Sequence, residues 1–264
     1  MNRINTLFTN KKTNILSIYF TAGYPDLGDT LEILKELDKA GVDMIEIGMP
    51  FSDPVADGPV IQKSSEKALS NGMSLNLLFE QISKVREITD IPIILMGYIN
   101  PVFRFGMEKF LARCNSTGID GTIIPDLPVE EYLESYESLF DKHNVLNIFL
   151  VSPQSPEERI KYLDSISKGF LYVVSSSATT GGTSGFLKSN TDYFEKLNNL
   201  NLKSPKLIGF GISDNKSYDK ACEFANGVII GSAFIRSLDI SGSLSSRINN
   251  FVKSIRDGRN NKNY

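Results

Sequence analysis

Eight short runs of apolar, strand-favouring residues alternate along this chain with longer segments that have the period of amphipathic helices. The expected strands cover 15–20, 43–48, 91–96, 121–124, 145–151, 169–174, 206–210 and 227–230. The expected helices cover 27–40, 75–89, 107–117, 129–142, 156–167, 191–200, 215–224 and 244–256. Strict alternation of eight strands with helices predicts a parallel sheet closed into a (β/α)8 barrel, the TIM-barrel fold.

The length of the chain agrees with one such barrel. It has 264 residues, and a (β/α)8 barrel typically needs about 250. An open, doubly wound sheet is the alternative, but no Gly-x-Gly-x-x-Gly follows the first expected strand. We see no long linker rich in Pro, Gly or Ser, so we expect a single domain over 1–264. Residues 1–14 are expected to form a helical cap on the barrel floor, and 257–264 a disordered tail.

Composition excludes several classes of function. The net charge is -3, which lacks the basic footprint of a nucleic-acid-binding protein. No apolar run approaches the roughly 18 residues that a membrane span needs. The segment 1–14 is polar and lacks the apolar core of a signal peptide, so we expect a cytoplasmic protein.

Cysteine and histidine offer little chemistry. Cys114 and Cys222 are far apart and show no metal-type spacing, so we interpret both as small buried hydrophobes. The single histidine, His143, lies in a polar turn. We therefore predict no metal site, and carboxylates, hydroxyls and backbone amides must carry any catalysis.

Glu46 is the most informative single residue. In the strand over 43–48 side chains alternate between the two faces, so Ile45 and Ile47 should face the helices, and Met44, Glu46 and Gly48 the barrel interior. A carboxylate inside a barrel is unstable unless it is paired or its pKa rises. A raised pKa suits a general acid/base, whereas the structural alternative is a buried ion pair. No expected strand interior offers the cation for that pair, which favours catalysis.

Two glycine-rich regions and a second carboxylate should meet Glu46 at the carboxyl ends of the strands, where barrel enzymes keep their active sites. Asp57, in the loop 49–59, is a turn former by type but a plausible second carboxylate by position. Asp53 in the same loop competes with it, although its Ser-Asp-Pro setting favours a turn or a partner contact.

The loop 175–189 is rich in Ser, Thr and Gly, so we expect a mobile segment that orders over substrate as a lid.

Glycines at consecutive strand ends predict a phosphate site. Gly209–Ser213 ends the seventh expected strand, and Gly227–Phe234 spans the eighth and opens a short helix. Glycine lets backbone N–H groups approach an anion, and a helix N-terminus adds favourable potential. Tight turns alone are the alternative explanation.

Six motifs, in order and in register, resemble the tryptophan synthase alpha-subunit family. They are MIEIGMPFSDPVADGPVIQ (44–62), LMGYINPVFRFG (95–106), GIDGTIIPDLPVEE (118–131), FLYVVSSSATTGG (170–182), LIGFGIS (207–213) and GVIIGSAF (227–234). The opening IYFTAGYPD (18–26) also fits, and the resemblance covers about residues 4–256.

The resemblance implies an activity and a set of site residues. The expected reaction is the aldol cleavage of indole-3-glycerol phosphate to indole and glyceraldehyde-3-phosphate. Glu46 would be the general acid/base, and Asp57 would hydrogen-bond the indole N–H. The substrate would contact Tyr172, Tyr19, Met96 and Thr180, and its phosphate would bind at Gly181, Gly211, Gly231 and Ser232.

The resemblance also implies a partner. The family needs no cofactor in this subunit, because pyridoxal phosphate belongs to a beta subunit that receives indole through a tunnel in an α2β2 heterotetramer. The loop 49–59 and the Asn100–Pro101 segment match the region that faces this partner.

One departure keeps other functions open. The family usually reads Gly-Val-Thr-Gly after the sixth strand, and this chain has Ala178 in place of the first glycine. If that position needs a positive φ, alanine would strain it and affect loop closure. A catalytically weak subunit that mainly regulates the beta subunit is therefore the alternative. Two further alternatives are a stand-alone lyase that releases free indole and a different phosphate-binding barrel enzyme, an isomerase.

Overall fold

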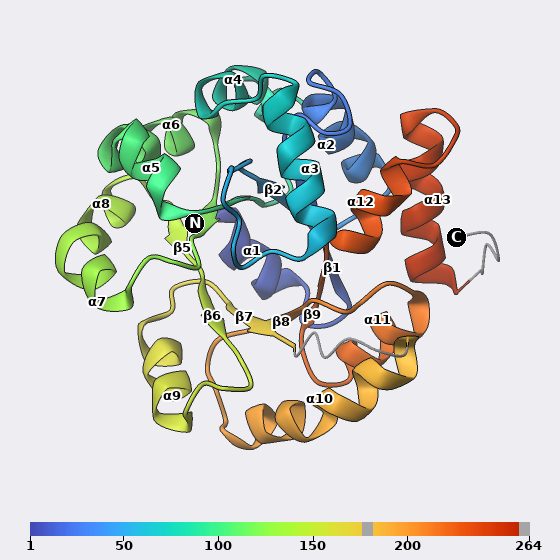
Figure 1. Ribbon diagram of the computed structural model, residues 1–264. Helices are drawn as coiled ribbons and strands as arrows, with labels where there is room; N and C mark the ends of the chain where they lie inside the picture. The colour runs from blue at the N-terminus through green and yellow to red at the C-terminus, as the bar shows by residue number, and fades with distance from the viewer. Residues whose placement is uncertain (176–181, 259–264) are drawn as a thin grey trace.

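Parallel strands form a ring enclosed by helices in the computed structural model, which describes residues 1–175 and 182–258, with backbone alone for 182–189 (Figure 1). Each pair of neighbouring strands is parallel, in the order β5-β4-β3-β2-β1-β9-β8-β7-β6. The strands are β1 Ile15–Thr21, β2 Met44–Gly48, β3 Ile93–Met96, β4 Gly121–Ile123, β5 Leu146–Asn147, β6 Phe149–Val151, β7 Leu171–Val174, β8 Lys206–Gly209 and β9 Gly227–Ile230.

The ring closes through the fifth predicted strand. Only Ile148 separates β5 from β6. β5 pairs with β4 while β6 pairs with β7, and the Ile148 amide donates to the Thr122 carbonyl at 2.9 Å. These two short strands are halves of one barrel strand, so the predicted (β/α)8 barrel is confirmed and the continuous strand 145–151 is corrected to a divided one.

Most helices cover the outside of the ring, whereas the N-terminal helix lies across the barrel interior (Figure 1). Within the described residues none is long and apolar enough to cross a membrane. They are α1 Arg3–Asn10, α2 Thr30–Lys39, α3 Pro59–Ser70, α4 Leu75–Gln81, η1 Val85–Glu87, α5 Ile99–Phe105, α6 Met107–Thr117, α7 Val129–Glu131, η2 Tyr132–Tyr136, α8 Glu137–Lys142, α9 Glu157–Ile166, α10 Gly182–Asn199, α11 Asn215–Cys222, α12 Ser232–Leu238 and α13 Leu244–Asp257.

Several predicted boundaries were wrong. The sequence interpretation missed α3, although Pro59 at its first position is a common start for a helix. It also missed α5, and the helix expected over 75–89 ends at Gln81. α10 begins at Gly182 instead of 191, so the loop expected over 175–189 is shorter than predicted. Asp257 is the last residue of α13 and Gly258 its C-cap, while 259–264 lie outside the described residues. The division into one domain stays a prediction.

Side chains from each strand form two apolar layers. On β2, Met44 belongs to the cluster inside the barrel, together with Ile94, Leu207 and others. Its neighbours Ile45 and Ile47 belong to the cluster between strands and helices. The alternation predicted for β2 is therefore confirmed, and it determines which side chains can reach the barrel interior.

The extra N-terminal helix closes the barrel interior at the amino ends of the strands. Ile4 and Phe8 of α1 are buried in the inner cluster, and the Phe8 ring lies 5.6 Å from that of Phe170. The Asn2 side chain caps α1 and donates to the Asp120 carbonyl at 2.8 Å. The helix thus fills apolar space that the ring of strands would otherwise leave open.

Phe8→Ala should destabilise the protein by about 3–5 kcal/mol, because it leaves a cavity between α1 and the inner cluster. Urea unfolding at equilibrium measures the change. Thr9→Ala, at an exposed position of the same helix, should stay within about 0.5 kcal/mol of wild type. Equal stability of the two variants would show that α1 does not fill the interior.

Candidate active site at the carboxyl ends of the strands

Glu46 points into the barrel from β2 and is completely buried. Its Oε1 accepts a hydrogen bond from the Ser17 hydroxyl at 3.0 Å, and its Oε2 has no partner among the described residues. Burial raises the pKa of the Glu46 carboxyl to about 8, which the Ser17 hydrogen bond opposes. In the part of the chain that the structure describes no cation pairs with Glu46, which argues against the buried ion pair. Around neutral pH the side chain is therefore mostly protonated.

Two tyrosines lie close to this carboxyl. Tyr19 on β1 is the register neighbour of Glu46, and Tyr172 projects from β7 on the inner face. Burial and the negative charges of Glu46 and Asp57 raise the pKa of both tyrosine hydroxyls. The two rings are therefore neutral, flat surfaces beside the acid.

Glycine makes room for each of these rings. A Cβ at Gly48 would overlap the Tyr19 hydroxyl, and a Cβ at Gly209 would overlap the Tyr172 hydroxyl. Both glycines are the last residues of their strands. Their missing side chains thus allow the tyrosines to lean across the carboxyl ends of the strands.

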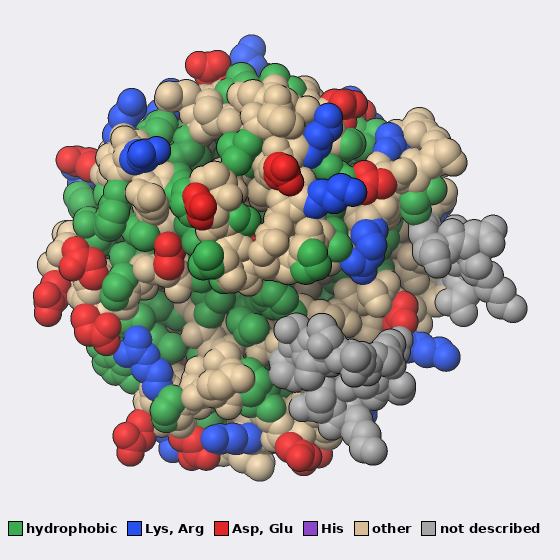
Figure 2. Space-filling view, viewed as in Figure 1, with side chains coloured by type: hydrophobic (Ala, Val, Ile, Leu, Met, Phe, Trp, Pro, Cys, Tyr) green, Lys and Arg blue, Asp and Glu red, His purple; other side chains and the backbone are tan. Residues whose placement is uncertain are grey.

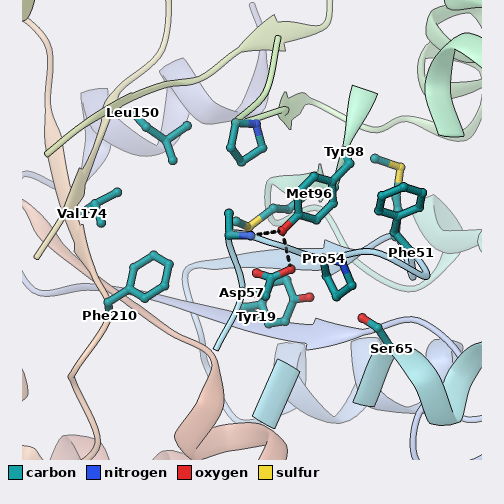
Figure 3. A pocket seen from close by; sticks show the side chains of 14 residues that line it. Tyr19, Phe51, Pro54, Asp57, Ser65, Met96, Tyr98, Leu150, Val174 and Phe210 are labelled. Atoms are coloured by element: carbon teal, nitrogen blue, oxygen red, sulfur yellow. Dashed lines mark hydrogen bonds between the residues drawn. The ribbon is translucent and has the colours of Figure 1, made fainter. Parts of the chain in front are cut away.

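Asp57 is held in the loop before α3 by Tyr98. The Tyr98 hydroxyl donates to Asp57 Oδ2 at 3.0 Å and accepts from the Ala56 amide at 2.9 Å. Figure 3 shows Asp57 between the Tyr98 and Tyr19 rings. Burial raises the pKa of the Asp57 carboxyl, and the Tyr98 hydrogen bond opposes the rise. Asp53 instead accepts a hydrogen bond from Ser52 and lines a separate surface groove.

Two neighbouring cavities lie at this end of the barrel, and hydrophobic side chains gather there at the centre of the face in Figure 2. Both are lined by Tyr19, Asp57, Met96 and Phe210. The first, of about 130 Å³, is otherwise mainly apolar and is also lined by Met49, Phe51, Pro54, Ala56, Ser65, Gly97, Tyr98, Pro125, Leu150 and Val174 (Figure 3).

The second cavity, of about 280 Å³, reaches the predicted phosphate site. Tyr172, Gly211, Gly231 and Ser232 line it, together with Ile61, Ile212, Ser213, Ile229, Ala233 and Arg236. Gly231 is close-packed, because a Cβ there would lie 3.3 Å from Tyr19 Cδ1. Glu46 lines neither cavity, whereas its register neighbour Tyr19 lines both.

The structure brings most of the predicted site residues together. Glu46, Asp57, Tyr19, Met96, Tyr172, Gly211, Gly231 and Ser232 meet at one end of the barrel. Thr180, Gly181 and Ala178 lie outside the described residues. Among the described residues, no group of three or more His, Cys, Asp or Glu side chains could hold a metal ion.

Sequence reasoning did not anticipate one residue of the site, Phe210, and one contact, the hydrogen bond from Tyr98 to Asp57. The sequence indicates that Tyr98, near a strand end, could form part of a flat apolar wall, and it lines the apolar cavity. Only the fold shows its hydrogen bond to Asp57. Phe210 lines both cavities with a positive φ of 70°, followed by Gly211 at 73°. The Ser175 hydroxyl donates to the Phe210 carbonyl at 2.8 Å, which stabilises this strained turn. A phenylalanine before Gly-Ile-Ser gives no sequence signal for such a conformation.

A closed barrel with two carboxylates and a glycine-lined cavity at the carboxyl ends of its strands defines a (β/α)8-barrel enzyme. A family profile described as "Tryptophan synthase alpha chain" matches residues 6–260. The tryptophan synthase alpha chain of Flavobacterium psychrophilum is 52% identical over 255 residues, which cover 97% of this chain and 100% of that one. That of Christiangramia forsetii is 53% identical over 97% of this chain and 99% of its own.

Solved structures agree with this relationship. The crystal structure of tryptophan synthase subunit alpha from Legionella pneumophila matches with a TM-score of 0.87 and 32% identity, over 97% of this chain and 98% of that one. Tryptophan synthase from M. tuberculosis in its aminoacrylate-bound form gives a TM-score of 0.84 and 26% identity, with 97% and 98% covered. The chain belongs to the tryptophan synthase alpha chain family. It is a lyase of tryptophan biosynthesis that cleaves indole-3-glycerol phosphate to indole and glyceraldehyde-3-phosphate.

Gly48→Ala should lower stability by about 1–3 kcal/mol and reduce indole formation, because the new methyl group displaces the Tyr19 ring. Thermal unfolding and an indole assay measure the two effects. Gly28→Ala is the matched control, since a Cβ there meets nothing within 4 Å. Indistinguishable behaviour of the two variants would contradict the packing described for Tyr19.

The Glu46 pKa predicts a pH-dependent stability. The folded protein binds this proton more tightly than the unfolded chain, so the contribution is complete below the ordinary pKa near 4.5 and is lost as the pH rises through about 8. Glu46→Gln has no such proton to lose. Its unfolding free energy should fall less than that of wild type, by a few kcal/mol, between about pH 5 and about pH 9. Parallel pH profiles in urea unfolding would rule out the raised pKa.

Proposed function

We propose that Glu46 is the general acid/base of the cleavage and that Asp57 stabilises the charged ring intermediate. The observation that carries the proposal is the buried Glu46 carboxyl, whose pKa of about 8 leaves it protonated and free of a counter-ion among the described residues. A group that titrates near neutral pH can both donate and accept a proton in one cycle.

Glu46 alone can supply and take back the one proton that the reaction moves. Protonated Glu46 donates its proton to C3 of the indole ring, and the positive charge that develops at the ring nitrogen lies against the Asp57 carboxylate. The Glu46 carboxylate then takes the proton from the glyceryl hydroxyl next to the bond that breaks. The carbon–carbon bond electrons return to the ring, so indole and an aldehyde are released and Glu46 is protonated again.

Each of the two cavities suits a different part of the substrate, which supports these roles. The mainly apolar cavity suits the flat bicyclic ring, with Tyr19 and Met96 in its wall and Asp57 at its junction with the second cavity. The second cavity suits the phosphate, with Gly211, Gly231 and Ser232 in its wall and Tyr172 along the glyceryl chain. The resemblance adds Thr180 to the substrate contacts and Gly181 to the phosphate contacts.

The protein is further proposed to act with a beta subunit in an α2β2 heterotetramer in the cytoplasm. Membership of the alpha-chain family supports the partnership. Pyridoxal phosphate would then belong to the beta subunit. On the face expected to meet this partner, Val55 is 88% exposed and Phe103, on α5, is 49% exposed.

Glu46→Gln should lower indole formation by about 10²–10⁴-fold, because the amide cannot donate or accept the proton. Binding of glycerol 3-phosphate, measured by calorimetry, should persist and show that the variant is folded. Asp57→Asn is expected to lower turnover in the same assay. Near-normal turnover of Glu46→Gln would refute the assignment.

The alternative, a weakly active subunit that mainly regulates its partner, rests on Ala178. An indole-release assay with the beta subunit added and withheld separates the two proposals. Measurable turnover that rises with the beta subunit supports a catalytic subunit, whereas negligible turnover in both conditions supports the regulatory one. High activity without any beta subunit would favour a stand-alone lyase.

A further inference from the structure

We propose that Arg236 is a phosphate-binding residue that determines the preference of this enzyme for a phosphorylated substrate; this inference rests on the proposed division of the substrate between the two cavities. Asp57 and Arg236 are the charged side chains that line the 280 Å³ cavity within the described residues. A phosphate monoester carries about -1.5 to -2 charges near neutral pH. Without a cation, this cavity would present only the negative charge of Asp57 to that group.

The geometry of α12 directs Arg236 toward the predicted phosphate site. Arg236 follows Ser232 by four residues, so the two side chains lie on one face of the helix. Side chains of an α-helix lean toward its N-terminus, which brings the guanidinium back toward Ser232 and Gly231. The opposite face is anchored by Phe234 and Leu238, both fully buried. The rotation of the helix is therefore determined by packing, which places Arg236 in the wall of the cavity with its side chain exposed to solvent.

The guanidinium is available for an anion. Across 1–175 and 182–258 no salt bridge engages Arg236. The nearest acid along the chain, Asp239, accepts a hydrogen bond from the Tyr24 hydroxyl. A guanidinium can form two parallel hydrogen bonds to phosphate oxygens and carries a positive charge. A backbone amide or a serine hydroxyl can donate a hydrogen bond but carries no charge. Arg236 thus adds the net positive charge that the glycine-lined wall lacks.

The test compares Arg236→Gln with wild type on two substrates, with the beta subunit present. On indole-3-glycerol phosphate we expect KM to rise about tenfold, the loss typical of one charge-assisted hydrogen bond, with kcat little changed. On the unphosphorylated indole-3-glycerol the two proteins should perform equally. Glycerol 3-phosphate, titrated by calorimetry, should bind Arg236→Gln about tenfold more weakly than wild type.

Two control variants distinguish the loss of the Arg236 charge at this site from a general loss of charge or of folding. Lys253→Gln removes one positive charge from an exposed position of α13, and it should retain the KM and the glycerol 3-phosphate affinity of wild type. Arg236→Lys should recover part of the affinity, because it restores the charge without the bidentate geometry.

The possible outcomes are distinct. Unchanged KM and affinity in Arg236→Gln, or equal losses on both substrates, would overturn the role of Arg236. Absence of turnover in wild type would instead overturn the proposed catalytic role of this site. In that case the calorimetric titration with glycerol 3-phosphate still decides whether Arg236 binds phosphate.

Discussion

The burial of an acid without a counter-ion inside the barrel is the constraint on which the site depends. Glu46 is completely buried, has one hydrogen bond from Ser17, and has a pKa raised to about 8. An ionised carboxylate in that position would lack compensation, so the protein holds a proton there near neutral pH. The fold tolerates this group because the closed barrel and the α1 helix stabilise the interior around it. The same environment that opposes its ionisation makes it suited to proton transfer.

The shape of the site follows from small residues next to large ones. Gly48 and Gly209 end their strands without side chains, and the hydroxyls of Tyr19 and Tyr172 occupy that space. Tyr19 forms part of the wall of both cavities and Tyr172 part of the wall of the larger one, whereas Glu46 lines neither. Glycine at these strand ends is therefore needed for close packing of rings, in addition to any contact with an anion. This packing links the geometry of the strand ends to the shape of the cavity that Tyr19 and Tyr172 line.

The parts of the site that were predictable are those governed by local period and by topology. The two-residue repeat of a strand determines that Glu46 faces inward, and parallel strands bring their carboxyl ends together, so Gly211, Gly231 and Asp57 converge. The bond from Tyr98 to Asp57 joins residues 41 positions apart and has no sequence signal. The strained turn at Phe210 was equally hidden, since it depends on hydrogen bonds from Ser175.

The sequence by itself determined the alternation of strands and helices, the inward direction of Glu46 and the family, because these depend on residue type and spacing along the chain. Tertiary structure alone decided that the fifth strand is divided at Ile148 and that Tyr98 holds Asp57. It also decided the protonation of Glu46, since the pKa depends on what surrounds the carboxyl and not on its neighbours in sequence. Burial, and the contacts between distant residues, exist only once the barrel has closed.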